Sequence, residues 1–325
     1  MNRDWIESLR QYFFNPQAGL INIDAAMHLK KHHIPKSLFK FRGVNEYSLN
    51  NLEENTVWCT SASQFNDPYD SSLCFYFSDG IFNTNLGTAF ETLSKEKDSF
   101  FTKEHVDVIK NSTNPLKTVI EITAHLSDEP ITQEMEGLLY EALKDFENKE
   151  IIEMNSRFND AMKNGYKICS FSERLDSTLM WAHYAENHSG FAIEYDFSKL
   201  PVTDVRSRLL WPVIYDDQLF DATQFFSEQV KNGISNNFMG VISAIHKAKD
   251  WEYENEWRLI LPTGPDEPPL NYEVPLPVCV YLGAKIEPEK ESLIVKIAQS
   301  KNIPIFKMRL AHDKFKMIPQ IVDLN

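Results

Sequence analysis

Three closely spaced carboxylates lie in the segment Trp251–Arg258, which reads W-E-Y-E-N-E-W-R. If residues 251–262 form a strand, side chains alternate between its two faces. One face would carry Glu252, Glu254, Glu256, Arg258 and Ile260, and the other Tyr253, Asn255, Trp257, Leu259 and Leu261. Same-face neighbours lie about 7 Å apart, so the carboxylates repel one another unless they meet solvent or partners. Two interpretations follow: a solvated face with Arg258 paired to Glu256, or a catalytic carboxylate cluster on a rigid strand.

A second candidate group is the pair of cations in Leu38–Arg42, which reads L-F-K-F-R. Alternation would turn Phe39 and Phe41 toward the core and Lys40 and Arg42 the other way. The two cations could form structural salt bridges. They could equally hold the phosphates of a ligand, a task that suits the planar fork of arginine.

Hydroxyl and amide side chains follow the strand predicted at 56–61. Thr60 and Ser61 end this strand, and the turn-rich sequence F-N-D-P follows at 65–68. Asn66 and Asp67 are candidate ligand contacts, although Asp67 is more readily explained as satisfying turn backbone groups.

A fourth group begins at Ser170 and Ser172 and continues into a helix expected from 177 to 187. Trp181, His183 and Tyr184 lie on that helix. A single helical histidine is more often a hydrogen-bonded core residue than a catalyst. Because His183 and His188 are not four residues apart and no H-E-x-x-H is present, no metal is expected.

The predicted elements indicate an α+β protein with a central mixed or antiparallel sheet. Residues 1–36 form an N-terminal helical arm, 37–310 an α+β core, and 311–325 a C-terminal tail. A large helical insertion is expected at about 85–165, and residues 218–249 are also expected to be helical. Further strands are expected at 166–172, 191–196, 211–215, 278–282 and 303–308, and further helices at 45–55 and 288–301.

Composition excludes several classes of protein. The net charge of −14 disfavours broad binding to bare nucleic acid. The four cysteines show no metal-binding or disulfide spacing. No apolar run approaches the length of a membrane span and no signal pattern opens the chain, so we expect a cytoplasmic protein without membrane contact.

Six separated motifs resemble a bacterial family of unknown function, over roughly residues 37–310. They are F-K-F-R at 39–42, W-C-T-S followed by F-N-D-P-Y-D at 58–70, S-F-S at 170–172, L-M-W-A-H-Y-A-E-N-H-S-G-F-A-I-E-Y-D at 179–196, W-E-Y-E-N-E-W-R at 251–258, and V-Y-L-G at 280–283. This resemblance implies kinship and no particular activity.

The order of a basic strand, a hydroxyl-bearing strand and a late E-x-E strand also resembles ADP-ribosyltransferases, whose sheet is split. This resemblance implies NAD as the substrate. Glu256 would stabilise the oxocarbenium-like state formed when the nicotinamide–ribose bond breaks, and Glu254 would act as general base. Arg42 or Lys40 would hold the pyrophosphate.

The hydroxyl motif departs from that pattern, because it reads C-T-S rather than S-T-S. Ser61 would brace the nicotinamide, but Ser170 or Ser172 could occupy the same position. The candidate catalytic residues are therefore Glu256, Glu254, Arg258 and His183. The candidate NAD-binding residues are Lys40, Arg42, Thr60, Ser61, Asn66, Asp67, Ser170, Ser172, Trp181 and Tyr184.

Three functions follow from these observations. The first is an NAD-consuming enzyme, an ADP-ribosyltransferase or NAD glycohydrolase, acting on an unknown macromolecular acceptor as a toxin or antiphage-defence effector. The second is a metal-dependent nuclease or hydrolase using Asp67, Asp70, Glu194, Asp196 and Glu254. The third is a non-enzymatic sensor that binds a protein partner through the helical insertion.

Overall fold

The computed structural model describes residues 4–76, 90–92, 94–95, 100–127, 131–234 and 236–322. It confirms an α+β protein built on a mixed eight-stranded sheet of order β14-β13-β12-β5-β1-β4-β10-β6. The strands are β1 (Leu38–Arg42), β4 (Tyr166–Ser172), β5 (Phe191–Tyr195), β6 (Leu210–Pro212), β10 (Glu256–Pro262), β12 (Cys279–Leu282), β13 (Ile305–Leu310) and β14 (Met317–Ile321). Most neighbours are antiparallel, and β12 and β13 are parallel.

Three two-stranded sheets accompany the large one. They pair β2 (Thr56–Cys59) with β11 (Leu270–Glu273), β3 (Leu73–Cys74) with β8 (Phe220–Asp221), and β7 (Ile214–Asp216) with β9 (His246–Ala248).

Helices cover the sheets and form the N-terminal and inserted segments. The α-helices are α1 (Trp5–Phe13), α2 (Ile23–His33), α3 (Glu46–Glu54), α5 (Lys103–Asn111), α6 (Pro115–Leu126), α7 (Gln133–Gly165), α8 (Thr178–Tyr184), α9 (Val205–Leu209), α10 (Thr223–Asn232), α11 (Met239–Ala244) and α12 (Pro288–Ser300). The 3-10 helices are η1 (Ala18–Leu20), η2 (Ala62–Gln64), η3 (Phe197–Lys199) and η4 (Lys249–Glu254).

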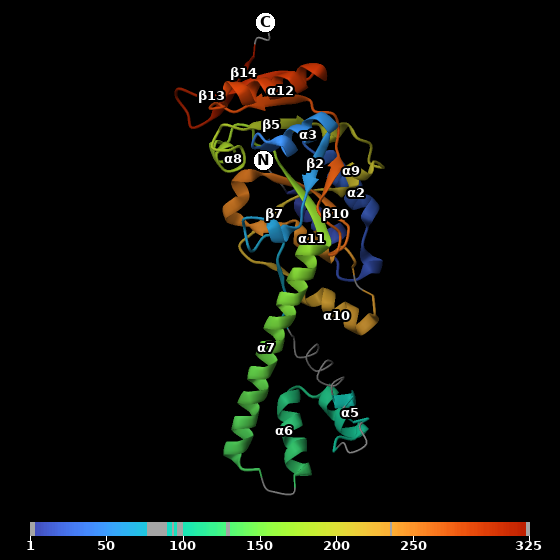
Figure 1. The fold of residues 1–325 in the computed structure, drawn as a ribbon. Coiled ribbons are helices and arrows are strands. Elements are labelled where there is room, and N and C mark those ends of the chain that lie inside the picture. The colour runs from blue at the N-terminus through green and yellow to red at the C-terminus, as the bar shows by residue number, and fades with distance from the viewer. Residues whose placement is uncertain are drawn as a thin grey trace.

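The helical insertion is dominated by α7, which projects from the body of the molecule, with α5 and α6 beside its far half (Figure 1). Thr132 caps this helix by accepting a hydrogen bond from the backbone N–H of Met135. Near the body, the Asn159 amide bonds both backbone groups of Leu73 in β3, at 2.9 Å each. The residues of the predicted insertion that lie at 85–89, 93, 96–99 and 128–130 are outside the described residues.

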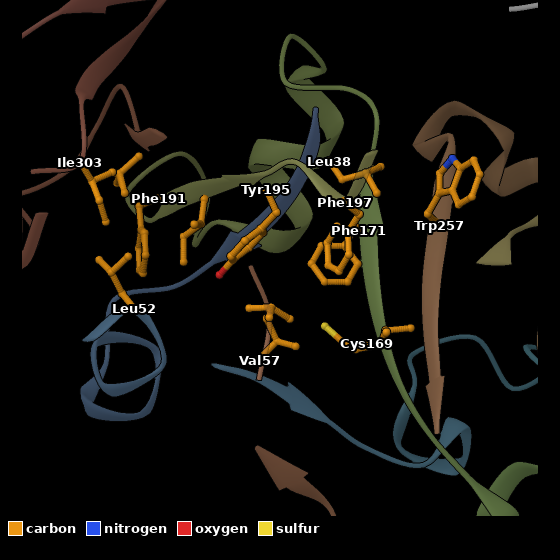
Figure 2. Close-up of a cluster of buried hydrophobic side chains, with 14 of the residues drawn as sticks. Leu38, Leu52, Val57, Cys169, Phe171, Phe191, Tyr195, Phe197, Trp257 and Ile303 are labelled. Carbon is orange, nitrogen blue, oxygen red and sulfur yellow. The ribbon is translucent and has the colours of Figure 1, made fainter. Parts of the chain in front are cut away.

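Strand alternation along β10 separates two hydrophobic cores. Trp257, Leu259 and Leu261 join the larger core, while Ile260 joins the second core, under α1, α2 and α11. Figure 2 shows Trp257 in the larger core with Phe171 of β4 and Tyr195 of β5. The predicted alternation of side chains between the two faces of the strand is therefore confirmed for residues 256–261. It turns Glu256 and Arg258 away from the larger core.

Three predicted elements were wrong in detail. Residues 251–254 belong to the 3-10 helix η4 rather than to a strand, and Asn255 adopts a left-handed conformation with φ of 44° before β10 begins. Residues 246–248, predicted as helix, form β9, which pairs with β7. Within the predicted C-terminal tail, residues 317–321 form β14 at the edge of the large sheet.

Candidate functional site

A cavity of about 210 Å³ opens where β1 and β4 separate. Five residue pairs join β1 to β5 and seven join β4 to β10. Between β1 and β4, both described throughout, the register pairs Phe39 with Ser172 and no other residues. The side chain of Lys40 crosses the opening, and its Nζ donates to the carbonyl oxygen of Ser170 at 3.0 Å. We call this space the inner cavity.

A buried charge cluster forms one wall of the inner cavity. Its members are Asp70, Lys247, Glu254, Glu256 and Arg258, each less than a tenth exposed. Lys247 Nζ lies 2.6 Å from Glu254 Oε2 and 2.9 Å from Glu256 Oε2. Arg258 binds both carboxylate oxygens of Asp70, at 2.7 and 2.6 Å, and Glu256 Oε1 at 2.8 Å. Three carboxylates against two cations leave one excess negative charge.

Local backbone geometry brings the two glutamates together. Glu254 ends η4, Glu256 begins β10, and the left-handed Asn255 between them turns the chain. Asparagine tolerates this conformation better than most residues. The turn places both carboxylates on Lys247 of β9, whose Nζ also lies 4.9 Å from the centre of the Trp251 ring.

The two glutamates differ in their partners and hence in their pKa. Burial and the neighbouring charge of Glu256 raise the pKa of Glu254. Burial acts in the same direction on Glu256, but the charges of Arg258 and Lys247 outweigh it and hold the pKa of Glu256 well below its usual range. Of the two glutamates, Glu254 is therefore the one that accepts a proton more readily.

Tyr184 connects the charge cluster to a second space. Its hydroxyl donates to Glu254 Oε1 at 2.6 Å, and burial together with the Glu254 charge raises its pKa. Tyr184 lines both the inner cavity and a cavity of about 750 Å³, which we call the outer cavity. The two cavities also share Lys40, Arg42 and Trp58 in their walls.

Lys40 and Arg42 lie at the junction of the two cavities, and neither has an acidic partner among the described residues. Within the described residues, neither Lys40 nor Arg42 forms an ion pair, and the Arg42 guanidinium donates to Asn51 Oδ1. Asn51 is itself buried and donates to Thr56 and Asn271 at 2.8 Å each. Arg42 is thus oriented by an amide and keeps its full charge for a ligand.

Most of the residues predicted from the sequence meet at the inner cavity. Those that line it are Lys40, Arg42, Thr60, Asn66, Ser170, Ser172, Tyr184, Glu254, Glu256 and Arg258. Ser172 also supports the wall, because its Oγ donates to the carbonyl oxygen of Glu254 at 2.5 Å. Arg258 is fully buried and its guanidinium donates six hydrogen bonds within the protein, so we infer that it positions the carboxylates rather than a ligand.

Four predicted residues lie elsewhere. His183 is exposed and lines only the outer cavity. Trp181 is buried in a small core, and its Nε1 donates to the carbonyl oxygen of Leu175 at 2.8 Å, so it does not contact a ligand. Asp67 Oδ1 accepts from the Tyr69 backbone at 2.9 Å, as the turn interpretation predicted. Ser61 is buried and lines neither cavity, whereas Ser170 and Ser172 line the inner cavity together with Thr60.

Sequence reasoning missed Lys247 and assigned Asp70 only to a metal site. Lys247 lies in a segment predicted to be helical, and no local pattern marks it. Of the other carboxylates of that metal hypothesis, Glu194 accepts from Tyr281 at 2.8 Å and Asp196 caps η3, both away from the charge cluster. Among the described residues, no group of three or more His, Cys, Asp or Glu side chains has an arrangement that could hold a metal ion.

Comparisons with known proteins identify one family. Residues 180–259 match the family model described as "Protein of unknown function (DUF2971)". Over this span the chain is similar to a family of unknown function, as its motifs predicted, and the span includes Tyr184 and Lys247 as well as both glutamates. No curated protein and no solved structure matches the chain, and the resemblance to ADP-ribosyltransferases gains no support. Among the described residues, no helix has the length and apolar character needed to cross a membrane.

Proposed function

We propose that this protein cleaves the bond between nicotinamide and ribose in NAD, as an NAD glycohydrolase or an ADP-ribosyltransferase. The observation that carries the proposal is the charge layout of the connected cavities. The charge cluster on one wall of the inner cavity has one excess negative charge, whereas Lys40 and Arg42, which line both cavities, are positive and form no ion pair within the described residues. NAD has the complementary arrangement, with a cationic nicotinamide ring at one end and a pyrophosphate beyond it.

The chemistry expected at the inner cavity uses that excess charge. As the bond from ribose to nicotinamide breaks, its electron pair goes to the nicotinamide nitrogen and positive charge develops on the ribose. A fixed carboxylate in a cavity of low dielectric stabilises this charge. We assign this position to Glu254, because Glu256 binds both Arg258 and Lys247, whereas Glu254 has Lys247 as its one cationic partner among the described residues.

Glu254 is also placed to complete the reaction. The oxygen of water, or of an acceptor, bonds to the ribose carbon, and its proton must leave. The raised pKa of Glu254 makes it a better proton acceptor than an ordinary glutamate. We therefore assign both the electrostatic role and the proton transfer to Glu254, and to Glu256 the role of holding Lys247 and Arg258.

The direct test is incubation of the purified chain with NAD, with separation and quantification of free nicotinamide. We expect release of nicotinamide with formation of ADP-ribose from water, or of a modified product when an acceptor protein is supplied. A folded wild-type chain that releases no nicotinamide, with or without a cell extract as a source of acceptors, would contradict the proposal.

A further inference from the structure

The outer cavity offers binding groups that the proposed cleavage does not use. Its volume, about 750 Å³, exceeds that of the inner cavity several times and is within the range of small-molecule sites. Its lining comes from α3, from the end of β1, from the β2–β11 pair and from the end of α8. Since Arg42 lines both cavities, a ligand that reaches from one to the other passes its guanidinium.

Trp58 presents a large apolar ring at the junction of the two cavities. Its side chain on β2 is 43% exposed, and within the described residues no other aromatic ring stacks on it. An exposed indole of this kind is a platform on which a flat ring such as a nucleobase stacks.

An amide is held beside that ring. Asn271 of β11 is the direct cross-strand partner of Trp58, so the two side chains lie on the same face of the pair. Asn271 Oδ1 accepts from Asn51 Nδ2 at 2.8 Å. This bond fixes the orientation of the Asn271 amide, and it leaves the N–H groups to donate and the second lone pair of Oδ1 to accept. Asn50, which also lines the cavity, is exposed and forms no hydrogen bond through its side chain among the described residues.

The same buried Asn51 that orients Asn271 also accepts from Arg42. One side chain therefore sets the spacing between a phosphate-binding guanidinium and an amide next to an aromatic platform. Adenine presents an acceptor beside a donor, which one asparagine amide matches, whereas guanine presents two acceptors that suit arginine or lysine. With Arg42 committed to phosphate, the amides favour adenine.

We propose that the outer cavity binds an adenine nucleoside diphosphate group, with the base stacked on Trp58 beside Asn271 and the diphosphate at Arg42. This assignment rests on the proposed function and extends it, because it gives a binding site to the adenosine diphosphate half of NAD, which does not react. It also predicts that ADP alone, which lacks nicotinamide, binds to the protein.

Isothermal titration with ADP, GDP and inorganic pyrophosphate tests this assignment. We expect ADP to bind more tightly than GDP, and Trp58→Ala to weaken ADP binding about tenfold, the equivalent of about 1.4 kcal/mol, without changing pyrophosphate binding. Trp58→Phe should restore most of the loss. Phe315→Ala, which truncates a fully exposed aromatic side chain, is the matched control and should change nothing. Because Trp58 is partly exposed, thermal melting should show that its variants remain folded.

Three results would overturn the assignment: no binding of ADP by the wild type, equal ADP binding by wild type and Trp58→Ala, or GDP binding as tight as ADP binding. The nicotinamide assay separates this outcome from the proposed function. Nicotinamide release without ADP binding would refute the adenine site alone. Trp58-dependent ADP binding by a chain that does not cleave NAD would refute the cleavage alone.

Discussion

The inner and outer cavities share Lys40 and Arg42 but differ in what their other polar groups contact. In the inner cavity, the charges of Lys247, Glu256 and Arg258 satisfy one another and are almost fully buried. In the outer cavity, the side chains of Trp58 and Asn50 are exposed, and among the described residues no ring stacks on Trp58 and no side-chain hydrogen bond involves Asn50. Breaking a buried charge pair leaves an uncompensated charge, which is costly, whereas removing an exposed group costs little.

This difference in burial means that substitutions in the two cavities should affect different properties, namely stability and ligand affinity. Substitutions in the inner wall should change the free energy of unfolding together with any activity, because the same contacts serve both. Substitutions around the outer cavity should change ligand affinity in a protein of nearly unchanged stability. The following predictions test this separation, beginning with the largest expected effect.

Arg258→Met should lower the free energy of unfolding by about 3–5 kcal/mol, because it leaves three buried carboxylates, Asp70 among them, with Lys247 as their one remaining cation in the cluster. Chemical denaturation measures the change. The control is Arg157→Met on α7, where the exposed pair with Glu153 should contribute nothing measurable. Equal stability of the two variants would show that the cluster does not support the fold.

His246, next to Lys247 in β9, should make stability depend on pH. Burial of the ring lowers its pKa to about 4, and it outweighs the bond between Nδ1 and the carbonyl oxygen of Ile242, 2.6 Å long, which acts in the opposite direction. In the unfolded chain the imidazole of His246 takes up a proton near pH 6.5, whereas in the folded chain it does so only near pH 4. The contribution of neutral His246 to the free energy of unfolding is therefore complete above about pH 6.5 and is lost as the pH falls toward 4. The loss amounts to ~3 kcal/mol.

His246→Asn keeps a donor for Ile242 but has no titrating ring. The stability of wild type minus that of this variant should therefore shrink between pH 6.5 and 4, as followed by urea denaturation at several pH values. A difference that stays constant over this range would show that His246 is not held neutral by the fold.

Arg42→Met tests the junction of the two cavities. Loss of a charged hydrogen-bond donor to phosphate should raise KM for NAD about tenfold or more, while kcat changes little, because the contact is made equally before and during bond cleavage. Arg309→Met, at an exposed arginine that lines neither cavity, is the control. An unchanged KM in a folded Arg42→Met protein would place the phosphates elsewhere.

The sequence predicted well those features that depend on local pattern. The bounds of β1 and β4 match the strands predicted at 38–42 and 166–172, because alternation and the breaks beside them mark these strands. Tertiary pairing accounts for what was missed. Lys247 contacts the glutamates because β9 pairs with β7. No local sequence pattern indicates this pairing, since β9 is three residues long and lies in a segment whose pattern predicts a helix.

The strand predicted for residues 251–255 shows a second limit. Glu254 and Glu256 do meet on one wall, but a left-handed turn at Asn255 achieves this rather than strand alternation. Trp181 shows a third limit. An aromatic residue in a motif is equally compatible with a ligand contact and with a core position, and its bond to the Leu175 carbonyl becomes visible only in the fold.

The rate of nicotinamide release from NAD by Glu254→Gln tests the central claim most directly. Glutamine keeps the size of the side chain and its capacity to accept from Tyr184, but it removes the excess charge and the proton acceptor. We predict a fall in kcat of about 10²–10³, with Glu252→Gln, an exposed neighbour in η4, at the wild-type rate. A folded Glu254→Gln protein that cleaves NAD as fast as the wild type would contradict the account.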